Sequence, residues 1–433
     1  MESFTWGVGT SAYQVEGGRQ DGKSDSIWDR FTAERGLEDG TRACDHYHRY
    51  PEDVALMAEL GIDAYRLSIA WSRVLPDGTG PVNQAGLNFY RRLVDELLAA
   101  GIEPWVTLYH WDLPQALQDR GGWPQRWMAD AFTEYAVVVA DALGDTVQHW
   151  ITHNEPWVAT MLGHQEGVFA PGITDWSRAL AAGHHILLSH GKATRELRRT
   201  APGSSIGIAL DCRPVTPLSD GPADVAACRH FDGYRNRWFF DPVFGRGYPE
   251  DMVDAYMDAG RLDHHLIQPG DYAPIAAPID FLGLNYYTSL RIGAGQEETE
   301  NSGVPQGAPA VEGHTEMGWP NTPEALTGYL HHIANTYRPK SIVITENGAS
   351  YSDTPDDDDA RRIDYLSTHI DAVMAAREEG VPVDGYFVWS LLDNLEWTSG
   401  YSQRFGLVWV DHETGERTPK RSYRWFAERI AES

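Results

Sequence analysis

From one end to the other, the chain alternates short, β-rich apolar runs with helical patterns. This alternation is typical of βα units, which build parallel sheets. We count eight such runs, the number that closes a (β/α)₈ TIM barrel, and α/β barrels of this length often form one domain. We therefore predict a single barrel domain over residues 1–433 with elaborated loops after its strands. The predicted strands are Trp6–Ala12, Ala64–Ile69, Pro104–Tyr109, His149–Thr152, Ser205–Leu210, Phe281–Asn285, Ile342–Thr345 and Gly385–Trp389.

Turn and cap residues mark the ends of several helices between these strands. Pro51–Asp53 predicts a helix start and Gly61 its end, because proline suits the first helical turn and acids suit its positive dipole. Asn83 is a candidate cap for the next helix, whose apolar residues repeat at helical spacing until Gly101. A similar pattern predicts a helix over residues 361–378.

Two segments are predicted to be loops. Residues 291–323 are rich in Gly, Glu, Pro and Asn, and we expect them to form a long connection over the barrel mouth. The run Asp353–Asp359 is acidic and contains a proline, but its spacing matches no calcium-binding loop. We predict a solvated surface turn there.

The charge balance excludes several classes of partner. With 35 basic and 63 acidic residues the net charge is −28, and such a surface repels nucleic acid and anionic membranes. Apolar stretches are too short to span a membrane and the first residues do not resemble a signal region, so we expect a cytoplasmic protein with no membrane partner. Cys44, Cys212 and Cys228 fit neither a disulfide framework nor a metal site and are predicted to be reduced. The acidic surface reflects either salt adaptation or a base composition that favours arginine.

Two glutamates stand where a β-rich run gives way to turn residues. Glu155 follows Trp150–Asn154, and Glu346 follows Ile342–Thr345. Each alone is better explained as a strand-end carboxylate in a surface ion pair. Together, at the carboxyl ends of two strands of one barrel, they could face each other across a sugar. Glycoside hydrolysis needs that pair: one carboxylic acid to protonate the leaving oxygen and one carboxylate on the other side of the anomeric carbon.

Other polar and aromatic residues recur at the predicted strand ends, which is where barrel enzymes place their sites. Amides, an imidazole and indoles are the mixture that sugar recognition requires: polar groups for hydroxyls and flat faces for the C–H side of the ring. Arg66 lies inside an apolar strand and needs a carboxylate partner, for which we predict Glu346. No phosphate loop or metal-type histidine spacing converges here, so we expect no metal and no cofactor. The strand-end residues are Gln14, Arg66, His110, Trp111, Asn154, Glu155, Asn285, Tyr287, Glu346 and Trp389, followed by Glu396 and Trp397.

At this point the chain resembles the β-glucosidases of glycoside hydrolase family 1. The resemblance covers almost the whole chain, and its motifs are numerous and in order. They are Phe4–Gly7, Ser11–Gly17, Asp45–Tyr50, Thr107–Pro114, Asn154–Pro156, Asn285–Tyr287, Ile344–Gly348, Glu396–Trp397 and Arg404–Leu407.

The resemblance implies a role for each of these positions. Glu155 would be the acid/base and Glu346 the nucleophile of a retaining reaction, with their carboxyl groups about 5–5.5 Å apart rather than the roughly 6.5–9.5 Å of inverting enzymes. Trp157 and Trp319 resemble residues on the side of the leaving group. The residues implied to line the sugar site are Gln14, His110, Trp111, Asn154, Asn285, Tyr287, Trp389, Glu396, Trp397 and Phe405.

The expected substrates are small-molecule β-glycosides and cello-oligosaccharides with a terminal β-D-glucosyl residue. Glu155 stands where the related plant thioglucosidases carry glutamine, which favours an O-glycosidase. Glu396 to Phe405 occupy the stretch where 6-phospho-β-glycosidases bind phosphate, and a carboxylate there would repel it. Alternatives are a 6-phospho-β-glycosidase, a transglycosidase, and a sugar-binding protein without activity. The sequence leaves open whether glucose, galactose or fucose is preferred.

Overall fold

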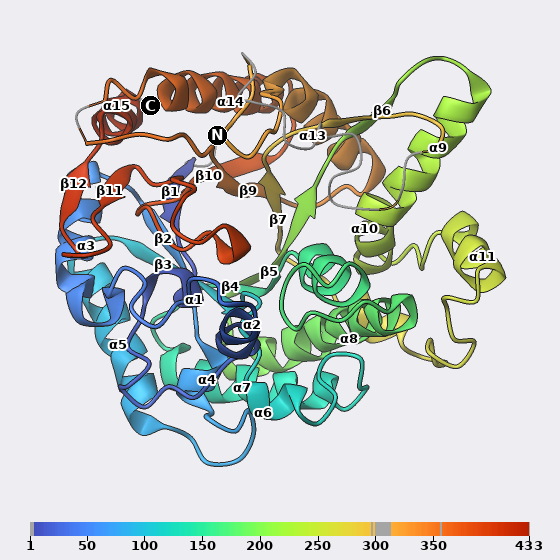
Figure 1. Cartoon of the computed structure of the whole chain (residues 1–433), viewed down its shortest axis with the longest axis horizontal. Coiled ribbons are helices and arrows are strands. Elements are labelled where there is room, and N and C mark those ends of the chain that lie inside the picture. Colours follow the sequence, from blue (N-terminus) through green and yellow to red (C-terminus); the bar gives the residue numbers. More distant parts are fainter. Residues whose placement is uncertain (1–3, 296–297, 299–312, 356, 433) are drawn as a thin grey trace.

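In the described part of the chain, eight parallel strands close into a barrel, which confirms the predicted fold class (Figure 1). The computed structural model describes residues 4–295, 298, 313–355 and 357–432. Every strand lies within three residues of its predicted bounds. The barrel strands are β1 (Thr5–Gly9), β2 (Ala64–Ser68), β3 (Glu103–Tyr109), β4 (His149–Asn154), β5 (Ser205–Cys212), β7 (Phe281–Tyr286), β9 (Ile342–Asn347) and β10 (Val383–Trp389).

The barrel closes where its first strand meets its last. β1 pairs in parallel with β10, from Thr5 opposite Gly385 to Gly9 opposite Trp389, and with β2 on its other edge. Closure leaves no free edge in the main sheet. It also brings the carboxyl ends of all eight strands to one rim.

A small apolar cluster fills the barrel beneath that rim. The rings of Phe281 and Phe387 lie 5.0 and 5.1 Å from the ring of Trp105, centroid to centroid. Gly7 makes room for this filling, because a Cβ atom there would lie 2.4 Å from the ring of Phe387. The cluster consists of Ala64, Trp105, Ile151, Ala209, Phe281, Val343 and Phe387. This cluster forms the apolar floor of the barrel, beneath the polar residues of the rim.

Helices surround the strands, and a larger apolar core lies between the two layers (Figure 1). Two small sheets pair β6 (Val215–Pro217) with β8 (Leu290–Ile292) and β11 (Val408–Val410) with β12 (Arg417–Pro419). Within the described ranges, no helix has the length and apolar character that a membrane crossing needs. The helices are α1 (Ala12–Val15), α2 (Ile27–Arg35), α3 (His46–Leu60), α4 (Trp71–Val74), α5 (Gln84–Ala99), α6 (Gln115–Gln118), α7 (Met128–Leu143), η1 (Val158–Gln165), α8 (Trp176–Thr200), α9 (Pro222–Asp232), η2 (Gly233–Arg237), α10 (Trp238–Val243), α11 (Glu250–Asp258), α12 (Tyr272–Ile275), α13 (Pro323–Thr336), α14 (Ala360–Glu378), η3 (Trp397–Ser399) and α15 (Arg421–Ala431).

One predicted helix start differs from the structure, and one predicted cap residue makes other contacts. α3 begins at His46 rather than at Pro51, which lies inside the helix. The turn before the proline is held because Nδ1 of the buried His46 lies 2.8 Å from Oδ2 of Asp53, two turns further on. α5 begins directly after Asn83 as predicted, but the Asn83 amide donates to the carbonyls of Gly22 and Arg73 instead of capping the helix.

The structure describes one of the two predicted loops only in part and shows the other to be partly buried. In the segment 291–323, residues 296–297 and 299–312 lie outside the described residues; the segment begins within β8, and Trp319 near its other end reaches the rim. The prediction of a solvated turn over 353–359 is wrong in part. Asp357 and Asp358 are exposed, but the side chains of Asp353 and Asp359 are buried in ion pairs with Arg362 of the following helix and, for Asp353, also with the distant Lys420. The helix predicted over 361–378 is confirmed as α14, and all three cysteines carry buried, free thiols as predicted.

Candidate active site

A cavity of about 310 Å³ opens at the carboxyl ends of the strands, above the apolar floor. Backbone strain is concentrated at its wall: Trp111, Glu155 and Trp397 adopt positive φ angles of 75°, 46° and 46°. Such angles cost a non-glycine residue about 1–2 kcal/mol and are found where function fixes a side chain. The predicted residues that line the cavity are His110, Trp111, Glu155, Asn285, Tyr287, Trp319, Glu346, Trp389, Glu396, Trp397 and Phe405.

Glu346, at the end of β9, has a cation and a phenol as neighbours. Nη1 of Arg66 donates to its Oε1 at 2.5 Å, and the hydroxyl of Tyr287 donates to its Oε2 at 2.7 Å. The ion pair predicted for Arg66 is therefore present. Burial raises the pKa of Glu346, while Arg66 and Tyr287 oppose that rise by stabilising the carboxylate.

Glu155 follows β4, and among the described residues no guanidinium hydrogen-bonds its carboxyl group. Its backbone N–H donates to the carbonyl of Ala209 on β5 at 2.9 Å, and Nδ2 of Asn285 donates to its Oε1 at 2.7 Å. Burial raises the pKa of Glu155 well above its ordinary value, and the charges of Glu346 and Asp211 raise it further. Two carboxyl groups in one cavity thus have different environments, one suited to an anion and one to a proton carrier.

The side chain of Asn154 connects the neighbouring strands behind the two glutamates. Its Oδ1 accepts from Nη2 of Arg66 at 2.6 Å and from Nδ2 of Asn285 at 3.0 Å. Its Nδ2 lies 3.1 Å from Nε2 of His110, and burial lowers the pKa of this imidazole well below its ordinary value. His110 is therefore neutral and accepts through Nε2, which leaves Nδ1–H as the donor of the ring.

Aromatic rings at and beyond the ends of β3 and β10, together with a third carboxyl group, form further parts of the cavity wall. The ring of Trp397 lies 4.6 Å from that of Trp111, and the ring of His110 lies 5.6 Å from that of Trp389. Burial, together with the charge of Glu346, raises the pKa of Glu396 to about 8. Flat apolar faces beside carboxyl and amide groups suit a sugar ring.

Comparison with known proteins places this arrangement in a family. The sequence profile of "Glycosyl hydrolase family 1" matches residues 1–433. The chain belongs to glycosyl hydrolase family 1. It is 44% identical to β-glucosidase A of Acetivibrio thermocellus, over 99% of this chain and 97% of that protein, and 42% identical to β-glucosidase A of Thermotoga maritima, over 98% and 96%.

Solved structures resemble this chain throughout the fold. The AHE enzyme of Alicyclobacillus herbarius superimposes with a TM-score of 0.95 at 46% identity, over 100% of this chain and 98% of that one. The family 1 β-glucosidase of T. maritima gives 0.93 at 42% identity, over 100% and 97%. That protein has also been solved in complex with castanospermine and with glucoimidazole.

Four of the predicted site residues do not line the cavity of this family 1 chain, namely Arg66, which the strand-end reasoning selects, and Gln14, Asn154 and Trp157, which the family resemblance selects. Arg66 and Asn154 lie directly behind the two glutamates, as described. The amide of Gln14 donates to Oδ1 of Asn394 at 3.0 Å and to the carbonyl of Leu395 at 2.8 Å, so both of its hydrogens are engaged. Trp157 is only 1% exposed, and the guanidinium of Arg235 lies 3.6 Å from its ring centroid, between the indole and the cavity.

Sequence reasoning missed four charged residues that line the cavity: Glu166, Asp211, Arg213 and Arg235. Asp211 and Arg213, at and beyond the end of β5, line the cavity together with Arg235 of η2. Asp211 directly follows the predicted strand Ser205–Leu210, so the strand-end criterion used for the other strands would have found it. The position of Arg235 depends on the folding of η2 against the barrel and has no local signal.

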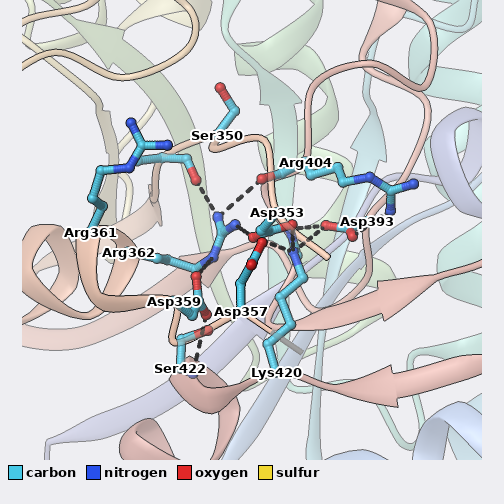
Figure 2. A network of polar contacts seen from close by, with 12 residues as sticks. Ser350, Asp353, Asp357, Asp359, Arg361, Arg362, Asp393, Arg404, Lys420 and Ser422 are labelled. Atoms are coloured by element: carbon cyan, nitrogen blue, oxygen red, sulfur yellow. Dashed lines mark hydrogen bonds and ion pairs between the residues drawn. The ribbon is translucent and has the colours of Figure 1, made fainter. Parts of the chain in front are cut away.

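A buried network of ion pairs stabilises two chain segments that reach the cavity (Figure 2). We call Asp353, Asp359, Asp393, Arg362, Arg404 and Lys420 the C-terminal ion-pair network. In Figure 2, the side chains of Arg362 and Lys420 both point to Asp353. Lys420 Nζ also lies 2.8 Å from Oδ1 of Asp393, which accepts the backbone N–H of Gly406 at 2.9 Å.

This network fixes two segments that reach the cavity. Asp393 precedes Asn394, the partner of Gln14, and Glu396 follows shortly after; Gly406 follows Phe405. Although burial alone would raise it, Lys420, Arg362 and Arg404 hold the pKa of Asp393 below its ordinary value. Burial keeps the pKa of Asp353 above its ordinary value in spite of Arg362 and Lys420.

Proposed function

We propose that this chain is a retaining β-glucosidase in which Glu346 is the nucleophile and Glu155 the acid/base. It hydrolyses terminal β-D-glucosyl residues of small-molecule β-glucosides. We extend the proposal to cello-oligosaccharides and to β-galactosyl and β-fucosyl residues, because a polar wall with amide and carboxyl groups can accommodate either orientation of a ring hydroxyl.

One observation carries the assignment of roles. Both glutamates are buried in the same cavity, but only Glu346 accepts hydrogen bonds from a guanidinium and a phenol. These donors favour the ionised form that attacks a carbon atom. For Glu155, burial first and then the negative charge of Glu346 favour the protonated form, and the single amide N–H that Asn285 donates only partly opposes them.

In the first step, a carboxylate oxygen of Glu346 forms a bond to the anomeric carbon while the bond from that carbon to the leaving oxygen breaks. The proton of Glu155 moves to the leaving oxygen. The products of this step are the free aglycone, a glycosyl ester on Glu346, and an ionised Glu155.

In the second step, Glu155 takes a proton from water, and the water oxygen attacks the anomeric carbon and releases Glu346. Two inversions at the same carbon give net retention. Because the ester has no negative charge, Glu155 loses the repulsion that favoured its protonated form, and it is free to act as a base. Arg66 and Tyr287 stabilise Glu346 again as it leaves.

The test is a panel of nitrophenyl β-glycosides with the first product followed by NMR. We expect nitrophenol release from the β-glucoside, with β-glucose appearing before its α-anomer. A matched nitrophenyl 6-phospho-β-glucoside should be hydrolysed far more slowly, since Glu396 faces the sugar. No release, or α-glucose as the first product, would overturn the proposal, and a dominant transfer product at high acceptor concentration would redefine it as transglycosylation.

A further inference from the structure

The two-carboxylate reaction makes no use of an ion pair on the leaving-group side of the cavity. Arg235 of η2 binds the carboxylate of Asp211 at the end of β5 through Nη1. Asp211 is 7% exposed and Arg235 is 4% exposed, and both line the cavity that contains Glu155. A buried charge pair next to reacting groups affects their energies more than a surface pair would.

The strand register brings Asp211 close to the acid/base. The N–H of Glu155 donates to the carbonyl of Ala209, and Asp211 is the next residue of β5 on the same face as Ala209. Asp211 stands opposite Asn285 in the pairing of β5 with β7, and it is Asn285 that donates to Oε1 of Glu155. Asp211 and the Glu155 carboxyl group therefore border the same amide.

Arg235 is fixed from two directions. Its guanidinium stacks on Trp157, two residues after Glu155, and binds Asp211 on the neighbouring strand. The next residue, Asn236, accepts from the N–H of Arg213 at 3.1 Å and donates to its carbonyl at 2.9 Å, which joins η2 to the end of β5. The pair thus has one rigid position relative to Glu155.

We propose that Asp211 and Arg235 are positioning residues for proton transfer: Asp211 retains the proton on Glu155, and Arg235 keeps Asp211 ionised and limits its effect. This proposal rests on the function assigned to Glu155 above. The electrostatics agree with it. After burial and the charge of Glu346, Asp211 raises the pKa of Glu155, and Arg235 lowers it.

The pair matters most in the second step of the reaction. Once Glu346 is glycosylated it has no charge, so Asp211 becomes the main remaining anion beside Glu155 and sets its strength as a base. Glu166 and Arg213 stand in the same cavity. The charged or titratable groups that face Glu155 or act on it through a direct neighbour are Glu346 of β9, Asp211 of β5, Arg235 of η2, Arg66 of β2, His110 after β3, Tyr287 after β7 and Glu396 after β10.

The experiment measures the pH dependence of kcat/KM for an alkyl β-glucoside, whose poor leaving group needs the proton of Glu155. Asp211→Asn should move the basic limb of the profile to lower pH, by about half a unit, or about threefold in rate at a fixed pH on that limb. Arg235→Gln should move the same limb to higher pH. The double variant Asp211→Asn/Arg235→Gln should return it towards the wild-type position.

Opposite shifts that cancel are not expected from a structural defect, which would lower the rate at every pH. Asp251→Asn is the matched control, because Asp251 binds Arg237 of the same helix η2 and does not line the cavity; its limb should not move. If the Asp211→Asn variant does not fold, the test compares the basic limb of Arg235→Lys with that of Arg235→Gln, because only Arg235→Lys keeps the positive charge.

Shifts in the same direction, or an unmoved limb in Asp211→Asn, would overturn the role of the pair. Failure of the proposed function looks different: Glu155→Ala would then lose activity equally on aryl and alkyl glucosides. If Glu155→Ala slows the alkyl glucoside more than the aryl glucoside while Asp211→Asn leaves the basic limb unmoved, only the proposed role of the Asp211–Arg235 pair is wrong.

Discussion

Two buried clusters of carboxylates in this molecule differ in how their charge is balanced. In the C-terminal ion-pair network, three aspartates meet the cations of Arg362, Arg404 and Lys420. At the cavity, acids outnumber cations: Glu155, Glu166, Asp211, Glu346 and Glu396 stand with Arg213 and Arg235 in the wall and Arg66 behind it. The pKa of Asp393 is accordingly lowered, although burial keeps that of Asp353 raised. Burial raises the pKa values of Glu155, Glu346 and Glu396, and like charge adds to the rise for Glu155 and Glu396.

The difference separates a structural cluster from a chemical one. Balanced charges remain ionised and hold segments of the chain in place. An excess of buried negative charge retains protons at neutral pH, and a group that can give up such a proton is an acid catalyst. The folded protein tolerates the unfavourable cluster because the favourable one and the apolar core hold its walls.

The strongest test of the chemical cluster removes the proposed nucleophile. Glu346→Gly should lower kcat for nitrophenyl β-glucoside by at least about 10⁴-fold, because no covalent intermediate can form. Added azide should restore turnover and give the α-glucosyl azide, identified by NMR, since a single displacement inverts the anomeric carbon. A β-configured azide product, or activity that survives without azide, would assign the nucleophile elsewhere.

Removal of the proposed acid should have an effect that depends on the substrate. Glu155→Ala should slow an alkyl β-glucoside by about 10²–10⁴-fold, because the departing alkoxide needs the proton. The first step with a dinitrophenyl β-glucoside should fall less than about tenfold, since that leaving group departs as a stable anion. Pre-steady-state release of dinitrophenol measures this step directly, and equal losses on both substrates would contradict the acid role.

A substitution in the structural cluster, the C-terminal ion-pair network, should lower the unfolding free energy rather than change the reaction. Lys420→Met leaves Asp353 and Asp393 without one of their cations, and breaking a buried pair costs about 3–5 kcal/mol of unfolding free energy. Urea unfolding measures this loss. Lys340→Met is the matched control: its side chain is 72% exposed and lies 3.8 Å from Asp280, so the change should stay within about 0.5 kcal/mol. Similar losses of unfolding free energy in both variants would mean that the network stabilises the fold no more than a surface ion pair does.

The smallest expected effect is a change in the pKa of Glu155 during the reaction. In the free enzyme Glu155 must be protonated, so kcat/KM falls as pH rises through its raised pKa. After trapping with a 2-fluoro-glucoside, Glu346 is uncharged and the pKa of Glu155 should be lower. Hydrolysis of the trapped ester needs the ionised form, so its rate should rise with pH at a lower midpoint. Identical midpoints in the two measurements would show that Glu346 does not control Glu155.

The sequence predicts the chemical cluster better than the structural one. Strand positions and both glutamates follow from local signals, because a polar residue at the end of an apolar run is visible in a short window. The pairing of Arg66 with Glu346 follows from the fold class, because a barrel brings strand ends to one rim and a buried arginine needs a carboxylate. The acidic run 353–359 is read as solvated because Lys420, a partner of Asp353, is distant in sequence, and because Arg362 folds back onto the run only once α14 has formed. The start of α3 depends in the same way on the His46–Asp53 pair, and Arg235 depends on how η2 docks.

The pairing of β1 with β10 has a consequence for the synthesis of this protein. A ribosome that has made β1 must add roughly 380 more residues before the partner strand is complete, which takes about 20–80 s at ~5–20 residues per second. During that time the growing sheet is an open ribbon whose outer backbone groups are unsatisfied and able to pair with another nascent chain. Translation speed and chaperone protection of this ribbon therefore bear on the yield of native enzyme as directly as its final stability does.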